Sequence, residues 1–305
     1  MGSMILPLSP HPRSRKDLSA QTTARGFPLP LSVWIDRSRG SEVPLPASLK
    51  RFYGSLRLEK GNRAPHVFGN LATTLDGVVA FGDRRGTGGG DITGHSVEDR
   101  ALMGILRALA DAVVVGAGTV RAIPRHLWTP AHIFPAWAGS YRRLRSATGG
   151  LDEPWNVVIT ARGTVDPGWP VFSSGKVPAA IVTTRSGARR LSRAHFPEST
   201  RVLIAAEGHH LSALDILSTL RAEVPVRRVL VEGGPHLLGD FLKESRLGEL
   251  FLTLSPQFAG NSAGDGALRL VEGVSFGPSD PRWAELLSLR QSKSHLFLRY
   301  QIHPA

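Results

Sequence analysis

The sequence has no cysteine and no long apolar segment. Without cysteine there can be no disulfide, no thiolate catalysis and no Cys-ligated zinc or iron–sulfur centre. A membrane-spanning helix needs roughly 20 apolar residues. The best candidate, Phe27 to Ile35, is short and is interrupted by Pro28 and Pro30. We therefore expect neither a signal peptide nor a membrane segment, and a cytoplasmic location.

Aromatic residues and lysines are also few, and this bears on the partners of the chain. Lys plus Arg number 37 against 25 Asp plus Glu, a formal net charge of +12, and only 6 of the 37 are lysines. Arginine suits bidentate phosphate contacts, so an anionic ligand is conceivable. Aromatics make up 7 % of the chain and no Lys/Arg-rich block is present. We expect no nucleic-acid binding.

The 305 residues, 41 % of them hydrophobic, suit one large α/β domain with extensions. Residues 1–25 lack periodicity and are expected to be a disordered arm or a tag remnant. Residues 26–64 are predicted to be a wrapping extension, and residues 65–305 the main domain. The residues expected to anchor the extension are Val33, Trp34, Ile35, Leu49, Phe52, Tyr53, Leu56 and Leu58.

From His66 onward, strand and helix patterns alternate. The run Ala112 to Val115 is typical of a strand covered on both faces of a parallel sheet. Ser96 and Asp99 resemble a capping box at the start of a helix. Residues 296–302 alternate in polarity and predict an antiparallel strand. The pattern predicts a wound, mostly parallel sheet with helices on both faces. Residues 124–154 show neither period and are expected to be a lid or a disordered loop.

Two glycine-rich turns directly follow predicted strands. Gly116-Ala117-Gly118-Thr119 follows the 112–115 run, and Gly233-Gly234-Pro235 follows the strand that ends at Glu232. Ligands of α/β sheets bind beyond the carboxyl ends of the strands, and glycines let a backbone approach a phosphate. Either turn alone could simply be a tight turn that binds nothing. Two such glycine-rich turns, each after a parallel strand, fit a ligand with two phosphates, namely a dinucleotide.

Two carboxylates lie within the same group of motifs. Asp76 follows a strand in the segment Thr74-Leu75-Asp76-Gly77, and Glu232 precedes the second glycine turn. The simpler interpretation makes Asp76 a turn residue and Glu232 an acceptor for a turn N–H. The functional interpretation directs both carboxylates toward a ligand at the edge of the sheet.

Together these motifs resemble the reductase domain of the bacterial bifunctional deaminase-reductases of riboflavin biosynthesis, which has a dihydrofolate-reductase-like fold. The resemblance covers roughly residues 66 to 303, with the motifs in the family's order and spacing. The matching segments are Thr74-Leu75-Asp76-Gly77, Asp91-Ile92-Thr93-Gly94, Arg107 to Ala112, Val115 to Arg121, Glu232-Gly233-Gly234-Pro235 and Leu254 to Gly260. The deaminase half needs cysteine ligands, so only the reductase half is represented.

The resemblance implies NADPH-dependent reduction of a pyrimidine or pteridine-like small molecule, as in 5-amino-6-(5-phosphoribosylamino)uracil reductase, without a metal and in a homodimer. The implied cofactor residues are Ala72, Gly116, Ala117, Gly118, Thr119, Thr160, Arg162, Gly233, Gly234, Pro235 and Leu237. The implied substrate residues are Thr74, Asp76, Thr93, Arg121 and Glu232. Asp76 would orient the substrate or deliver a proton, and Glu232 would form hydrogen bonds to the substrate or to groups on the nicotinamide side of the cofactor. A pKa raised in a dry cleft would let either donate a proton.

Two positions depart from the family pattern. Val78 stands where a basic residue usually follows Asp-Gly, and Ala122-Ile123-Pro124 replaces an Asp-Asp-Pro segment. Both missing groups face a sugar phosphate in the family, so we expect poor turnover of the phosphoribosylaminopyrimidine unless arginines of the 124–154 lid compensate. The alternatives are a reductase of the same fold with another substrate, such as a dihydropterin or a specialised metabolite, and a non-catalytic dinucleotide-binding protein.

Overall fold

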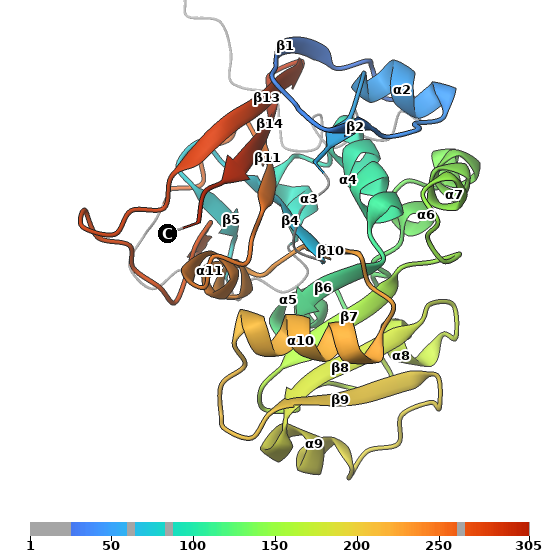
Figure 1. Ribbon diagram of the computed structural model, residues 1–305, viewed down its shortest axis with the longest axis vertical. Coiled ribbons are helices and arrows are strands. Elements are labelled where there is room, and N and C mark those ends of the chain that lie inside the picture. The colour runs from blue at the N-terminus through green and yellow to red at the C-terminus, as the bar shows by residue number, and fades with distance from the viewer. Residues whose placement is uncertain (1–25, 60–64, 83–87, 261–265, 305) are drawn as a thin grey trace, which may run out of the picture.

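The computed structural model describes residues 26–59, 65–82, 88–260 and 266–304, so the prediction for residues 1–25 lies outside the described residues. A ten-stranded sheet runs through the molecule (Figure 1). In spatial order its strands are β1 (Ser32–Asp36), β13 (Ala284–Ser292), β14 (His295–Ile302), β11 (Glu249–Leu254), β4 (His66–Thr73), β10 (Arg228–Val231), β6 (Ala112–Gly116), β7 (Trp155–Thr160), β8 (Ala179–Thr184) and β9 (Thr200–Ala206).

The predicted mostly parallel sheet is confirmed. Every neighbouring pair from β11 to β9 is parallel, whereas β14, β13 and β1 add antiparallel strands at the other edge. Two small ribbons pair β2 (Ser41–Glu42) with β3 (Arg57–Leu58), and β5 (Val78–Ala80) with β12 (Leu268–Arg269).

Helices cover both faces of the sheet, as the pattern predicts (Figure 1). One hydrophobic core contains side chains of α2 (Ala47–Tyr53), α4 (Val97–Leu109), α7 (Ala138–Ala147), α8 (Pro170–Ser173) and α9 (Arg185–Leu191). The other contains side chains of α10 (Ala213–Glu223) and α11 (Pro235–Lys243). Strand β6 serves both cores, because Val113 and Val115 point into the first and Val114 into the second. This is why its sequence is continuously apolar.

The extension shares the first core instead of forming one of its own. Leu49, Phe52 and Tyr53 of α2 are fully buried there. Two of the expected anchors are wrong: Val33 is 52 % and Trp34 68 % exposed. Their strand, β1, is the outermost strand of the sheet and pairs only with β13, so neither side chain reaches the core.

The region 124–154 is not an irregular lid. It contains α6 (Pro130–Ile133), a 3₁₀ turn η2 (Pro135–Trp137) and α7, and both Trp128 and Tyr141 are only 1 % exposed. The guanidinium of Arg145 is buried and donates to the carbonyls of Arg107, Ala108 and Ala110, at the C-terminal end of α4. The pattern missed α7 because its ten residues include three arginines, and the one at position 145 faces the core.

The short helices α3 (Gly89–Ile92) and α5 (Ala117–Ala122) complete the fold beside the carboxyl ends of β4 and β6. Within the described ranges, no helix combines the length and the hydropathy that crossing a membrane requires.

Candidate active site

The three sequence motifs meet at one edge of the sheet. Strands β4, β10 and β6 are adjacent and parallel, so the segments that follow them leave from the same edge. The two glycine turns are in direct contact, because the N–H of Gly116 donates to the carbonyl of Gly233 over 2.8 Å. A Cβ added to Gly234 would lie 3.4 Å from the Thr119 hydroxyl. The two turns therefore lie against each other at this edge.

The glycine turns leave open space on their outer side. A Cβ built on Gly118 or on Gly233 would meet no atom within 4 Å. Gly233 has a φ of +99°, which favours glycine, whereas Gly118 lies in α5 and needs no special backbone angle. Pro235 occupies the first turn of α11. Leu237 is buried in the core beneath that helix.

The predicted adenosine-side residues lie at the carboxyl end of β7 and just after it, next to the first glycine turn. The hydroxyl of Thr160 accepts a hydrogen bond from the N–H of Thr164. The exposed guanidinium of Arg121, on α5, donates to the carbonyl of Thr164 over 3.1 Å. Arg121 was predicted to contact substrate, but this bond places it with Thr160 and the exposed Arg162.

Asp76 joins two loops at the end of β4. Its carboxylate accepts hydrogen bonds from the Thr74 hydroxyl, at 2.5 Å, and from the N–H groups of Ala259 and Gly260, at 3.1 and 2.6 Å. The bond from Thr74 and those from the two backbone groups lower the pKa of Asp76 to about 2. The expected raised pKa is therefore wrong for this residue, because donors stabilise its ionised form.

Thr93, another predicted substrate residue, is buried at the end of α3. Its hydroxyl donates to the carbonyls of Gly89 and Gly90, and its own carbonyl is bonded by the ring of His295. In this arrangement Thr93 shapes the α3 turn, and its hydroxyl is already used within the protein.

Glu232, the first residue after β10, is held by a buried arginine. Arg107 of α4 donates from Nε to both carboxylate oxygens at 3.0 Å and from Nη2 to Oε2 at 2.7 Å. The two side chains are only 2 % and 4 % exposed. A bidentate pair of this kind fixes the plane of the carboxylate. Arg107 was part of a matching sequence segment but was not predicted as a site residue.

The structure adds a carboxyl group that sequence reasoning missed. Asp99, in the first turn of α4, is completely buried, and burial raises its pKa to about 6. The neighbouring hydroxyl of Thr253 lowers the pKa and the charge of Glu232 raises it. The Asp99 N–H donates to the Ser96 hydroxyl, so the capping pattern correctly located the helix start. That same pattern made Asp99 look purely structural.

Ala72 lies next to Thr253, the residue of the sheet that neighbours the Asp99 carboxyl group. On β4 it is the register partner of Thr253 on β11, so the two residues lie side by side. Asp99, Thr253 and Ala72 therefore lie close together at this edge of the sheet. The Arg107–Glu232 ion pair is next to Asp99. The arrangement combines a buried carboxyl group whose pKa is raised to about 6 with open glycine turns.

The comparisons with known proteins identify the family of the chain. The family model described as the RibD C-terminal domain matches residues 65–293. The chain belongs to this family. It is 27 % identical over 220 residues to the 2,5-diamino-6-ribosylamino-4(3H)-pyrimidinone 5′-phosphate reductase of Archaeoglobus fulgidus, covering 70 % of this chain and 88 % of that protein. It is 28 % identical to the riboflavin biosynthesis protein RibD of Aquifex aeolicus, covering 68 % of this chain but only 51 % of that protein.

Solved structures of RibD proteins share the fold. Acinetobacter baumannii RibD superposes with a TM-score of 0.57 at 19 % identity, covering 79 % of this chain and 59 % of that one. A pyrimidine reductase-like protein from Corynebacterium diphtheriae gives 0.56 at 19 % identity, covering 79 % and 93 %. The dihydrofolate-reductase-like fold expected from the sequence is confirmed, and the RibD family to which the chain belongs is one of oxidoreductases.

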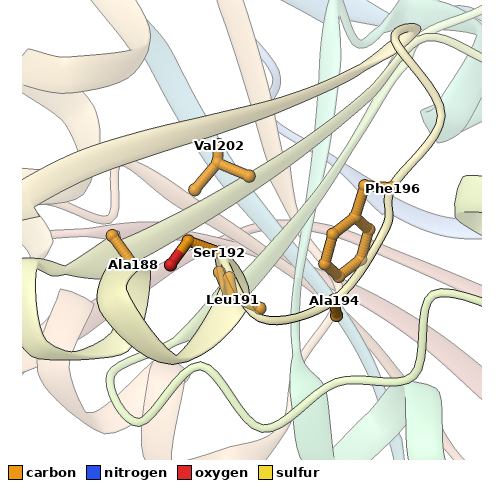
Figure 2. Close-up of a pocket in the computed structure, with 6 residues that line it drawn as sticks. All are labelled: Ala188, Leu191, Ser192, Ala194, Phe196 and Val202. Carbon is orange, nitrogen blue, oxygen red and sulfur yellow. The ribbon is translucent and has the colours of Figure 1, made fainter.

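One pocket lies elsewhere. Figure 2 shows it between α9 and β9, lined by Ala188, Leu191, Ser192, Ala194, Phe196 and Val202. Strand β9 is the last of the sheet, separated from β6 by β7 and β8. This mainly apolar pocket therefore does not belong to the edge that carries the predicted residues. Among the described residues no three His, Asp or Glu side chains are grouped so as to bind a metal.

Proposed function

We propose that this chain, through its region from residue 65 onward, reduces a pyrimidine or pteridine-like substrate with NADPH at the edge formed by β4, β10 and β6. One observation carries the proposal. A fully buried carboxyl group with a pKa raised to about 6, that of Asp99, lies at the same sheet edge as two adjoining glycine turns that leave open space. A reductase needs both a dinucleotide site and a proton donor beside it.

The glycine turns would hold the dinucleotide. Gly118 and Gly233 lack the side chains that would fill the space beside them, so a pyrophosphate can approach the backbone there. Arg162 and Arg121 carry exposed positive charges near Thr160, which suits the additional phosphate of NADPH. The bound cofactor supplies a hydride. The protein positions the reacting groups and excludes water.

Asp99 is the proposed proton donor. Reducing a C=N bond adds a hydride to carbon and a proton to nitrogen, so an acid must face the nitrogen. With a pKa of about 6, Asp99 still carries a proton in an appreciable fraction of molecules near neutral pH. Glu232, oriented by Arg107, would accept hydrogen bonds from the substrate. The proposed role of Asp76 is to hold the 256–260 loop, which it already bonds, at the mouth of the site.

Two substrate classes are open to the chain, and the structure contains an observation that favours the second. The name of the Archaeoglobus relative suggests a ribosylaminopyrimidine phosphate. Val78, however, is buried, and Ile123 lies close enough to Gly88 for a Cβ there to be 3.1 Å from its methyl group. Both side chains are apolar and leave a sugar phosphate without a partner at these positions. An unphosphorylated dihydropterin-like ring would need none.

The test is the oxidation of NADPH by the purified protein with each substrate class. Saturable turnover of either supports the reductase, and the ratio of kcat/KM between the ribosylaminopyrimidine phosphate and dihydrofolate identifies the class. NADPH binding without turnover of any candidate would favour the non-catalytic dinucleotide-binding alternative. A cytoplasmic location and a homodimer, as the family resemblance implies, are part of the same proposal and are tested by fractionation and by sedimentation.

A further inference from the structure

His126 contacts the proposed site from a segment that none of the sequence motifs includes. The Nη1 group of Arg107 lies 2.9 Å from Nε2 of this histidine. Weaker bonds from Nη1 reach the carbonyls of Leu127 and Thr129 at 3.4 and 3.3 Å. One end of the guanidinium therefore faces Glu232 and the other faces residues 126–129.

The contact requires an uncharged imidazole. Arginine N–H groups only donate, so Nε2 of His126 must accept and its ring proton must reside on Nδ1. The surroundings favour this state. Burial, followed by the charge of Arg107 and the neighbouring His132 of α6, lowers the pKa of His126 to about 2. The carboxylate of Glu232, on the other side of Arg107, is paired with Arg107 itself. Lys176 acts on His132 and disfavours a second positive charge there.

The segment that carries His126 is firmly attached to the sheet. Asn156 of β7 accepts from the N–H of Trp128 over 2.8 Å and donates to the carbonyl of the same residue over 3.4 Å. The His126 ring packs edge-on against Trp128, with centroids 5.1 Å apart, and against His132 at 4.6 Å. Because Trp128 is bonded to β7 and the His126 ring is packed against Trp128 and His132, His126 presents Nε2 to Arg107 in a defined direction.

We propose that His126 is a positioning residue. By accepting a hydrogen bond from Nη1, it holds the Arg107 guanidinium in the plane in which Nε and Nη2 donate to Glu232. The inference rests on the proposed function, because it assigns Glu232 and Asp99 to the reaction edge. Without the acceptor, a buried N–H of Arg107 has only the two long carbonyl bonds. The guanidinium then turns toward them, and the charge of Glu232 is less well compensated beside Asp99.

The experiment compares His126→Gln with His126→Leu. The glutamine oxygen can accept near the position of Nε2, whereas leucine keeps much of the volume and offers no acceptor. Carboxyl-carbon NMR follows the titration of Asp99 in the wild type and in both variants. We expect the Asp99 midpoint to rise by about one pH unit in the leucine variant, because a less compensated Glu232 disfavours a second negative charge, and to stay in place in the glutamine variant.

Kinetics supply the second readout. We expect kcat/KM to fall about tenfold to a hundredfold in His126→Leu, the loss of one charge-assisted hydrogen bond, with NADPH affinity unchanged and with activity restored in His126→Gln. If the leucine variant does not fold, His126→Asn replaces it, since its shorter amide cannot reach Nη1 from the same backbone.

An Asp99 midpoint that does not move in any variant, or that moves equally in the glutamine and leucine variants, would overturn the positioning role. The NMR titration does not depend on turnover. A wild type that oxidises no NADPH, combined with a midpoint shifted only in the leucine variant, would therefore refute the proposed function and leave the positioning of Arg107 standing.

Discussion

Replacing Asp99 by asparagine separates the effect of this buried carboxyl group on stability from its proposed effect on turnover. Burial raises its pKa from 3.8 to about 6, and each pH unit between these values is worth about 1.4 kcal/mol. The folded state holds this proton more tightly than the unfolded state. The free energy of unfolding therefore falls as the pH rises from about 4 to about 6, by about 3 kcal/mol in total. Above this range the penalty is fully present.

In the Asp99→Asn variant this penalty is absent, so we expect the protein to gain up to about 3 kcal/mol of stability at neutral pH, less the cost of burying the amide. At low pH the difference shrinks. Turnover moves in the opposite direction, because the variant has no proton to give, and kcat falls about a hundredfold to ten-thousandfold. Urea unfolding at a series of pH values and steady-state NADPH oxidation measure the two effects.

Asp240→Asn is the matched control. Asp240, on α11, also has a pKa raised by burial, with His210, Glu244, Lys243 and His236 as its ionisable neighbours. Its replacement should change stability in the same direction and leave kcat unaltered. The reasoning about Asp99 fails if Asp99→Asn keeps the wild-type kcat, or if its stability depends on pH as steeply as that of the wild type over the same range.

Three further outcomes test other parts of the site. Arg162→Ala should reduce NADPH affinity about tenfold to a hundredfold and leave NADH affinity unchanged in equilibrium titrations; equal losses for both would exclude a contact with the extra phosphate. Gly118→Val should abolish NADPH binding while circular dichroism and Tm remain near wild type, because no neighbour lies within 4 Å of the added Cβ; retained affinity would contradict the phosphate site. Arg145→Ala should lower the free energy of unfolding by about 3 kcal/mol or more, because three buried carbonyls lose their donor. The double variant Arg142→Ala, Arg143→Ala should alter neither stability nor kcat/KM. A kinetic defect confined to the double variant would restore the lid interpretation.

The parallel part of the sheet was predictable because its strands bury both faces. Continuous apolar runs such as 112–115 and 179–182 have few other structural interpretations, and β6 and β8 appear where the runs lie. The helix α7 was not predictable in the same way. Its buried face includes Arg145, whose charge is balanced by carbonyls at the end of α4. A pattern that counts only apolar residues treats such a position as exposed.

The position of the site was predictable for a topological reason. Parallel strands bring their carboxyl ends to one edge, so motifs that follow β4, β6 and β10 must lie near one another once these strands are neighbours. The electrostatics were not predictable from the motifs. Arg107 lies 125 residues from Glu232 in the chain, and Asp99 depends on Thr253 of β11 for its surroundings. Such contacts exist only after the sheet has assembled.

Three carboxyl groups at this edge have three different environments, and the difference assigns their proposed chemistry. Donors from Thr74 and from two backbone groups lower the pKa of Asp76, so it accepts hydrogen bonds and retains no proton. Arg107 holds the carboxylate of Glu232 in a fixed plane. Only Asp99 combines full burial with a raised pKa. Where neighbouring titratable groups are driven apart in this way, the group with the raised pKa is the acid. We therefore propose Asp99, in place of Asp76 or Glu232, as the proton donor, and the Asp99→Asn experiment tests that proposal directly.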